Sequence, residues 1–170
     1  MPHPIFFRLA RPDDAPAIRA IIARIYADYG DVLDTEREDP HLEHPCDYFR
    51  SHAGELWVAE GDGVVAGSGG IVLKTTAQPS FHDVCLSKDE FEIKTVYVAH
   101  EFRRRGIARR LVTMAIDYAR HSGWPRVMLW SDTRFVEAHR LYESMGFIRG
   151  EKRDIKIVNT FSEYRYDLMF

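Results

Sequence analysis

The fold of this chain is decided between residues 91 and 121, which read FEIKTVYVAHEFRRRGIARRLVTMAIDYARH. β-Branched and aromatic residues dominate Phe91–Val98, and this composition predicts a strand. Apolar residues recur at helical spacing in Gly106–His121, which predicts an amphipathic helix. The turn that joins them contains Arg103-Arg104-Arg105-Gly106-Ile107-Ala108. We therefore expect a buried strand, a basic turn and a helix in direct succession.

The chemistry of this turn suits a pyrophosphate group. The first turn of a helix offers unpaired N–H groups and the positive end of the helix dipole. Gly106 and Ala108 let a ligand approach the backbone closely, and the three arginines add positive charge. The alternative is a solvated basic turn that only starts a helix. The turn matches neither the G-x-G-x-x-G dinucleotide fingerprint nor the P-loop, which needs Gly-Lys-Ser/Thr.

Outward from this turn, the sequence predicts a mixed α/β fold with a mostly antiparallel sheet of about seven strands flanked by helices. The other predicted strands are Ile5–Leu9, Glu55–Glu60, Val64–Thr75, Arg126–Trp130, Phe147–Val158 and Tyr164–Phe170. Three further helices are predicted. The first begins after Arg11 and ends before Gly30, the second lies near His41–Ser51, and the third covers Phe135–Met145. Asp62-Gly63 predicts a hairpin turn, Gly67, Gly69 and Gly70 indicate a bulge or a close backbone approach, and Thr76–Asp89 is expected to be a loop.

Composition narrows the class of protein. The chain has 170 residues, of which 45% are hydrophobic, and these values fit one globular domain over residues 1–170. A net charge of -3 and a pI near 6.2 argue against a general nucleic-acid binder. No apolar run approaches the ~20 residues that span a bilayer. Because the N-terminus also lacks the pattern of a signal peptide, we expect a cytoplasmic protein with no membrane partner.

Cysteine and histidine give little sign of a metal or redox site. The two cysteines, Cys46 and Cys85, are too few for a disulfide framework and are expected to be buried or idle thiols. His41, His44 and Cys46 have metal-like spacing, but the chain offers no matching second pair of ligands. We therefore predict no metal site and expect these histidines on the surface or facing a substrate.

Three short motifs together resemble one family. Arg103-x-x-Gly106-x-Ala108 is similar to the acetyl-CoA signature of the GCN5-related N-acetyltransferases (GNAT), and Thr95–Val98 resembles the fourth strand of that family. Ala138-His139-Arg140-Leu141-Tyr142, followed by Gly146-Phe147, resembles its later helix. The motifs match in order and spacing as well as in type. One departure is Phe135, which stands where the family often has an asparagine that contacts the cofactor.

The resemblance implies direct transfer of an acetyl group from acetyl-CoA to an amine, without a covalent enzyme intermediate. It implies a splay between the fourth and fifth strands, with Val96 N–H directed at the acetyl carbonyl and Val98 pairing with the pantetheine. The residues Arg103, Arg104, Arg105, Gly106, Ile107 and Ala108 would hold the pyrophosphate. The side chains of both valines carry no chemistry and can belong to the strand core at the same time.

Two side chains are candidates for proton transfer. Tyr142 matches a tyrosine that family members often place near the coenzyme sulfur, where a phenol can protonate the leaving thiolate. Glu92 lies four residues before Val96, where some members carry a catalytic glutamate, and strict strand alternation puts both on one face. A strand bulge would invalidate that inference. The alternatives are a packed aromatic for Tyr142 and a solvated or salt-bridged carboxylate, paired with Lys94, for Glu92.

The acceptor is the least determined part. The acidic stretch Asp31–Asp47 falls where the family often builds its acceptor pocket, so it would favour a cationic amine on a small molecule or a peptide, although it is also a plausible solvated loop. Ser131, Asp132 and Thr133 are expected to form the N-cap region of the next helix or to orient a substrate. Tyr26, Tyr29, Tyr48, Phe49 and Trp57 are expected to be aromatic walls or core. A catalytically silent acyl-CoA-binding module is the alternative function, and the C-terminal strands offer an edge for a homodimer.

Overall fold

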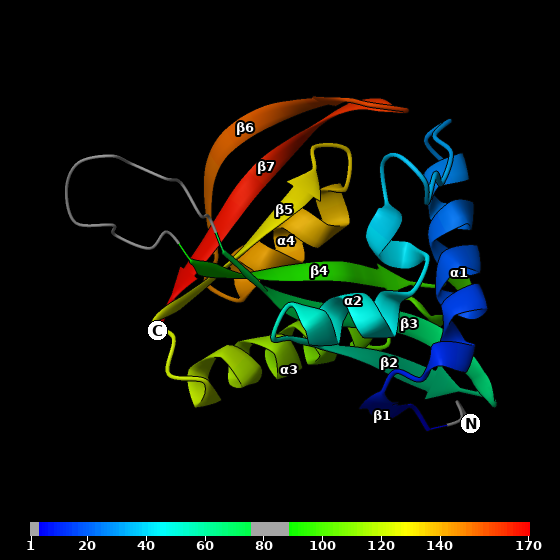
Figure 1. Cartoon of the computed structure of the whole chain (residues 1–170), viewed down its shortest axis with the longest axis horizontal. Coiled ribbons are helices and arrows are strands. Elements are labelled where there is room, and N and C mark those ends of the chain that lie inside the picture. Colours follow the sequence, from blue (N-terminus) through cyan, green and yellow to red (C-terminus); the bar gives the residue numbers. More distant parts are fainter. Residues whose placement is uncertain (1–3, 76–88) are drawn as a thin grey trace.

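The computed structural model describes residues 4–75 and 89–170, and the loop predicted at Thr76–Asp89 lies almost wholly outside this range, as does Cys85. The described strands form one seven-stranded sheet in the order β1-β2-β3-β4-β5-β7-β6. All neighbouring strands run antiparallel except β4 and β5, which are parallel. The predicted mixed, mostly antiparallel sheet is therefore confirmed (Figure 1).

The elements follow the predicted order. The strands are β1 (Phe6–Leu9), β2 (Glu55–Gly61), β3 (Val64–Lys74), β4 (Glu90–Val98), β5 (Arg126–Asp132), β6 (Ile148–Lys156) and β7 (Thr160–Met169). The helices are α1 (Ala15–Ala27), α2 (Pro45–Ser51), α3 (Ile107–His121) and α4 (Val136–Ser144), with short 3-10 turns at Pro12–Asp14, Pro40–Leu42 and His100–Phe102. Strand β7 starts four residues before the predicted position, because its pairing with β6 extends to Lys156↔Thr160.

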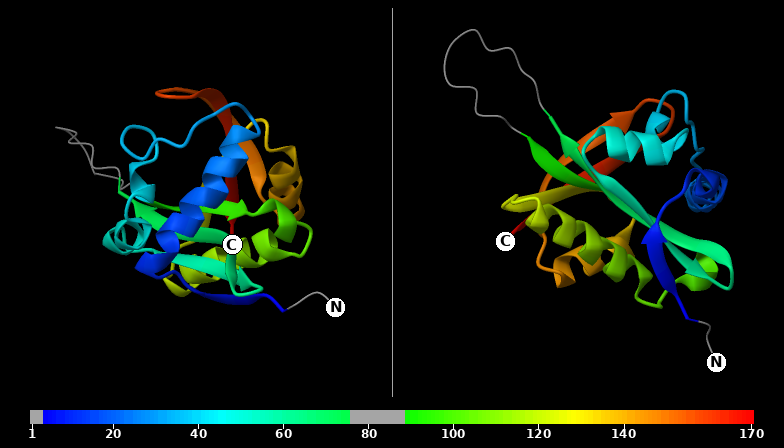
Figure 2. Two further views of the ribbon diagram at one scale, coloured as in Figure 1. Left: turned by 90° about the vertical axis from the view of Figure 1, so that its right-hand side faces the viewer. Right: turned by 60° about the horizontal axis from the view of Figure 1, so that its bottom comes forward.

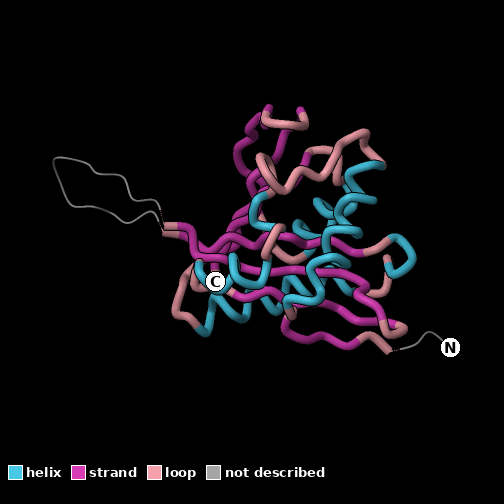
Figure 3. The backbone as a smooth tube through the Cα atoms, turned by 45° about the vertical axis from the view of Figure 1, so that its right-hand side comes forward, coloured by secondary structure: helices cyan, strands magenta, loops and turns pink. Residues whose placement is uncertain are grey.

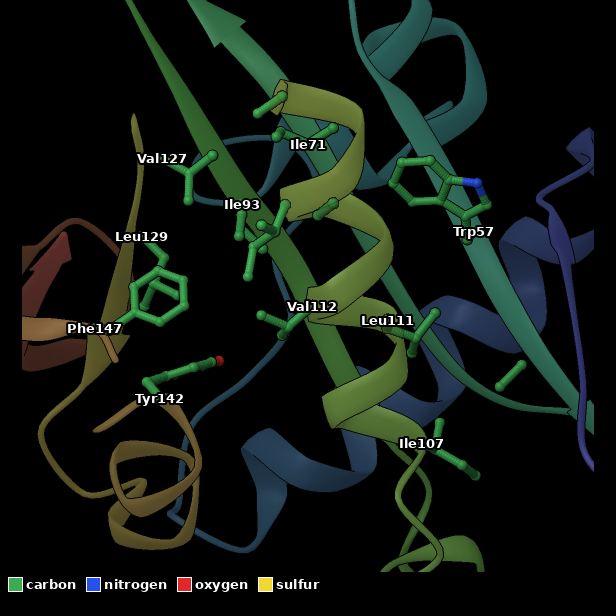
Figure 4. Close-up of a cluster of buried hydrophobic side chains, with 14 of the residues drawn as sticks. Trp57, Ile71, Ile93, Ile107, Leu111, Val112, Val127, Leu129, Tyr142 and Phe147 are labelled. Carbon is green, nitrogen blue, oxygen red and sulfur yellow. The ribbon is translucent and has the colours of Figure 1, made fainter. Parts of the chain in front are cut away.

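The helices cover the two faces of the sheet, and each face has its own core (Figure 2). On one face, Ile18 and Ile22 of α1 and Phe49 of α2 pack with Leu56 and Val58 of β2. The opposite face is larger and is built around α3, whose buried residues recur at the helical spacing that predicted it. Figure 4 shows this second core, with α3 packed mainly against β3 and β4. Burial of these apolar faces supplies the main driving force for the fold.

A bulge interrupts β4 at the point where the motif begins. Gly67 pairs with Val98 and Ser68 with Tyr97, but Gly70 then pairs with Lys94, so β4 carries one extra residue here. Thr95 takes the left-handed backbone conformation, with φ of 61°, and its buried hydroxyl has no hydrogen-bond partner among the described residues. On β3, a Cβ at Gly69 would stand 2.9 Å from Leu111 Cβ, so the predicted close approach at this glycine is present. The bulge reverses the side-chain alternation along β4.

Strands β4 and β5 separate soon after they meet. They pair only through Phe91↔Val127 and Glu92↔Met128, although β4 continues to Val98 and β5 to Asp132. Figures 1 and 3 show the two strands diverging. The edge of β4 from Ile93 onward therefore has no strand partner on this side, as the predicted splay requires. In the described part of the chain, no helix is long and apolar enough to cross a bilayer.

Candidate active site

The basic turn places the start of α3 beside the splay. Gly106 precedes the helix with φ of 76°, and Arg104 also has a positive φ of 63°. A Cβ built on Gly106 would meet no atom within 4 Å, so the space above this residue is open. Glycine is suited to this left-handed conformation, and the open space leaves the helix N–H groups accessible. The geometry fits an anion at the helix terminus.

A cleft of about 520 Å³ lies over this turn and reaches into the splay. Eight of the ten predicted site residues line it, from β4, the basic turn and α4: Val96, Val98, Arg103, Arg104, Gly106, Ile107, Ala108 and Tyr142. Two predicted residues do not line this cleft. Arg105 places its guanidinium over the Phe102 ring, with Cζ 5.4 Å from the ring centroid. Glu92 lines a different cavity.

Tyr142 closes the inner end of the cleft. Its side chain is buried, and Figure 4 shows it extending from α4 with the hydroxyl end directed toward α3. Its ring packs against Phe147 and Tyr166 with centroid distances of 5.8 and 5.7 Å. Burial raises the pKa of this phenol above its ordinary value, because the anion loses hydration. No hydrogen bond from the Tyr142 hydroxyl to another described residue is present, so the group is available to a ligand.

The cleft continues through the sheet. A narrow cavity of about 90 Å³ shares Val96, Tyr97 and Tyr142 with it, and lies between the separated edges of β4 and β5. A third cavity of about 250 Å³, which we call the inner chamber, shares Tyr26, Lys94 and Tyr97 with the narrow cavity. Tyr97 lines all three spaces. The splay therefore opens on two sides, with a constriction between the cleft and the inner chamber.

Glu92 lines the inner chamber and not the cleft, which corrects the prediction that it shares a face with Val96. Val96 packs against the α3 core together with Ile93, whereas Glu92 points to the opposite face beside Lys94. The bulge at Thr95 is the physical reason, because one extra residue reverses the alternation.

The surroundings of Glu92 match the salt-bridged alternative. Its buried carboxylate lies 2.9 Å from Lys74 Nζ and 3.4 Å from Lys94 Nζ. Burial alone would raise the pKa of this carboxyl, but the two lysines outweigh it and lower the pKa. A carboxylate held in its charged form by two cations is a weak proton acceptor.

The residues before α4 were only partly predicted. Phe135 lines the cleft and packs on Tyr29 with ring centroids 5.2 Å apart, so an aromatic wall replaces the amide that the family often has there. The predicted N-cap at Ser131, Asp132 and Thr133 is wrong, since Phe135 holds that position without a side-chain cap. Asp132 instead accepts hydrogen bonds from the backbone N–H and the guanidinium of Arg134.

Arg134 is a residue that sequence analysis missed. It lines the cleft, lies 2.5 Å from Asp31 and 2.6 Å from Asp132, and stacks over the ring of Tyr29. These contacts join the segment after α1 to the end of β5. The only signal in the sequence was the acidic segment itself, which gave no indication of its basic partner.

The acidic stretch is divided between paired and unpaired carboxylates. Asp31 pairs with Arg134, Asp34 pairs with Arg37, and Glu38 binds the amide of Asn159. Asp39 is buried in the wall of the inner chamber, which the half-buried His41 also lines. Of the predicted aromatic walls, Tyr26 and Tyr29 line cavities, whereas Phe49 and Trp57 belong to the core. Cys46 is a buried free thiol, and the described residues contain no group of three or more His, Cys, Asp or Glu side chains placed to hold a metal ion.

Comparison with known proteins finds a matching family model and several similar N-acetyltransferases. Residues 19–147 match the model of the acetyltransferase (GNAT) family. The chain is 32% identical over 146 residues to the uncharacterized N-acetyltransferase YjgM of Escherichia coli, covering 85% of this chain and 81% of that protein. It is 29% identical over 133 residues to human N-acetyltransferase 8, but spans only 54% of that longer protein.

Solved structures share the fold. An N-acetyltransferase from Staphylococcus aureus aligns with a TM-score of 0.74 at 18% identity and covers 98% of both chains. A putative acetyltransferase from Salmonella typhimurium, yncA, whose structure holds its cofactor acetyl-CoA, aligns with a TM-score of 0.71 at 20% identity over 97% of this chain and 93% of that chain. The family match, the relatives and the fold agree, and this chain belongs to the GNAT family of acetyltransferases.

Proposed function

We propose that the chain transfers the acetyl group of acetyl-CoA directly to a primary amine. The observation that carries this proposal is the series of three cavities through the β4–β5 splay, with Val96 and Tyr142 at the constriction. A thioester delivered from the cleft and an amine delivered from the inner chamber would meet there. Two reactants held in one orientation react much faster than the same groups in solution.

The cleft suits acetyl-CoA along its whole length. The open turn at Gly106, the first turn of α3 and the side chains of Arg103 and Arg104 would receive the pyrophosphate. The free edge of β4 would pair with the pantetheine through the backbone of Val98, as an added strand does. Val96 N–H would then hydrogen-bond to the acetyl carbonyl and stabilise the oxyanion that forms during attack.

Tyr142 is proposed as the group that protonates the leaving thiolate. It lines both the cleft and the constriction, and its raised pKa keeps the phenol protonated at neutral pH. A phenol in contact with the sulfur can donate its proton as the carbon–sulfur bond breaks. The family resemblance predicts Glu92 as the base, but its two lysine partners favour an electrostatic role for it instead.

The inner chamber supports a cationic acceptor. Its acidic side chains are Glu38, Asp39, Glu92 and Glu163, whereas its basic side chains are Lys94 and Arg153. Arg153 lies 2.7 Å from Glu163, and Lys94 is already engaged with Glu92. The negative charge that remains in the inner chamber would attract the acceptor while its amine is still protonated as an ammonium group. A polyamine, a lysine side chain and a basic antibiotic are the acceptor classes that fit.

A thiol-release assay with acetyl-CoA and a panel of amines tests the proposal. The panel contains spermidine, a lysine-containing peptide, a peptide with a free N-terminus and an aminoglycoside. We expect turnover with at least one amine, and we expect Tyr142→Phe to lower kcat by about 10²-fold with little change in acetyl-CoA affinity. Binding of acetyl-CoA without turnover on any amine would favour the silent acyl-CoA-binding module.

The single domain over residues 1–170 and the cytoplasmic location stay predictions. A homodimer through the C-terminal strands also stays a prediction. The exposed edge strand β6, where Ile148 is 72% exposed, supports such pairing.

A further inference from the structure

Asp39 is a buried carboxylate in the wall of the inner chamber. It is only 9% exposed, and its Oδ2 has no hydrogen-bond partner among the described residues. An unsatisfied buried oxygen of a carboxylate is costly, so a protein retains one mainly where it serves a function. Asp39 differs in this respect from Asp31 and Asp34, whose carboxylates are engaged by arginines.

The groups around Asp39 favour proton uptake. Burial and the nearby Glu38 and Asp34 raise the pKa of Asp39 to about 6, whereas Lys94 and the hydroxyl of Tyr26 lower it. The other titratable groups that line the same chamber are His41 from Pro40–Leu42, Glu92 and Tyr97 from β4, Arg153 from β6 and Glu163 from β7. Burial holds the pKa of His41 near 3, so His41 stays neutral. A carboxylate with a pKa near 6 is matched to accepting a proton at neutral pH.

A chain of hydroxyl groups leads from Asp39 toward the constriction. The Tyr26 hydroxyl donates to Asp39 Oδ1 over 3.4 Å, and the Tyr97 and Tyr26 hydroxyl oxygens lie 3.4 Å apart. Since Tyr26 donates to Asp39, its oxygen is left to accept from Tyr97. Tyr97 lines the cleft, the narrow cavity and the inner chamber. The chain therefore has one direction, from Tyr97 through Tyr26 to Asp39.

We propose that Asp39 is the final acceptor of the proton that the acceptor amine loses, and that this proton moves through Tyr97 and Tyr26. This inference rests on the proposed function. The acceptor enters this step as the neutral amine, and as its nitrogen–carbon bond forms and the carbon–sulfur bond breaks, the nitrogen gives one proton to the Tyr97 oxygen. Tyr97 passes its own proton to Tyr26, and Tyr26 passes its proton to Asp39 Oδ1. The thiolate takes a separate proton from Tyr142, so charge and protons balance.

Glu92 is less suited to this task. Its carboxylate is flanked by Lys74 and Lys94, which lower its pKa, and no hydroxyl chain links it to Tyr97 in the described part of the chain. The two carboxylates can therefore be separated by experiment.

The test compares the pH dependence of kcat in four single variants: Asp39→Asn, Tyr97→Phe, Glu92→Gln and Glu36→Gln. The acceptor is the panel amine that wild type acetylates fastest. Glu36→Gln is the matched control, because it removes one exposed carboxylate from the same segment. In wild type we expect kcat to fall below pH about 6. In Asp39→Asn we expect about 10²-fold lower kcat at neutral pH and no acidic limb near pH 6.

Tyr97→Phe should also lower kcat with little change in KM, and the double variant Asp39→Asn/Tyr97→Phe should lose no more than the worse single variant. Groups that act in one relay are not additive. An acidic limb that persists in Asp39→Asn but disappears in Glu92→Gln overturns the inference, and so does a change confined to KM. Calorimetry with acetyl-CoA verifies that each variant is folded. If wild type acetylates no panel amine, the proposed function fails first and this inference fails with it.

Discussion

At the residue scale, Gly106 and Asp39 both have local features that ordinary packing of the core does not require. Gly106 adopts a left-handed backbone conformation with open space around it, and Asp39 buries a carboxylate oxygen that has no partner in the described part of the chain. Both lie at a cavity wall. Local departures of this kind are expected where a protein binds or transforms a ligand.

Gly106→Asp is expected to weaken acetyl-CoA binding by at least tenfold. The new side chain adds bulk and negative charge where the pyrophosphate would lie, and its φ of 76° is strained for a residue with a Cβ. Isothermal calorimetry measures the affinity. Gly123→Asp, with φ of 77° and equally open surroundings after α3, is the control for backbone strain away from the cleft. Equal affinity in wild type and Gly106→Asp would refute the binding site.

Asp39→Asn is expected to stabilise the fold at neutral pH. The folded pKa of Asp39, about 6, is above the unfolded value of 3.8, so the native state binds a proton more tightly than the unfolded state. The contribution of Asp39 to the free energy of unfolding is fully present below pH 3.8 and is lost as the pH rises through 6. The variant should therefore gain on the order of 2–3 kcal/mol in free energy of unfolding at pH 7 and nothing near pH 3.5. Urea denaturation at both pH values measures this difference.

At the element scale, the bulge in β4 marks the boundary between what could and could not be predicted from sequence. Helix α3 and its basic turn were predictable, because periodicity and Gly106 are local signals. The extra residue at Thr95 has no local signal, since threonine is an ordinary strand residue and its positive φ is imposed by pairing with β3. This one residue moved Glu92 to the opposite face. The same limit hid the role of Arg134, because its partner Asp31 is distant in sequence.

Arg104 tests the turn that precedes α3. It is exposed and has φ of 63°, which costs a residue with a Cβ roughly 1 kcal/mol. Arg104→Gly should raise the free energy of unfolding by up to about that amount while weakening acetyl-CoA binding. Arg104→Gln should weaken binding to a similar extent without the gain in stability, because it removes only the charge. Thermal unfolding and calorimetry on both variants separate backbone strain from electrostatics, and a stabilised Arg104→Gln would contradict this assignment.

At the scale of the whole molecule, Arg134 connects parts that the sheet does not hold together. It bridges Asp31, beyond α1, and Asp132, at the end of β5, and its ion pairs raise the pKa of its guanidinium further above its ordinary value. The residues it joins lie on either side of the splay. Arg134 thus adds a polar contact beside the splay, whereas the α3 core packs along the whole length of that helix.

Arg134→Met is expected to lower the free energy of unfolding by about 1–3 kcal/mol, since it leaves two partly buried carboxylates without their partner. Arg134→Lys should recover only part of the loss, because an ammonium cannot reproduce the planar fork of arginine. Chemical denaturation of the three proteins measures the order. An Arg134→Met protein as stable as wild type would show that the bridge contributes nothing.

The short pairing between β4 and β5 affects the flexibility of the sheet. The sheet thus consists of two parts, β1 to β4 and β5 to β6, that are joined only through these two residue pairs. Thermal motion can vary the angle between the two parts. A ligand that hydrogen-bonds along the free edge of β4 and also contacts α4 would hold the two parts of the sheet at one fixed angle. Part of its binding free energy would then go into restricting this motion. Bound acetyl-CoA would therefore set the shape of the inner chamber before any amine binds.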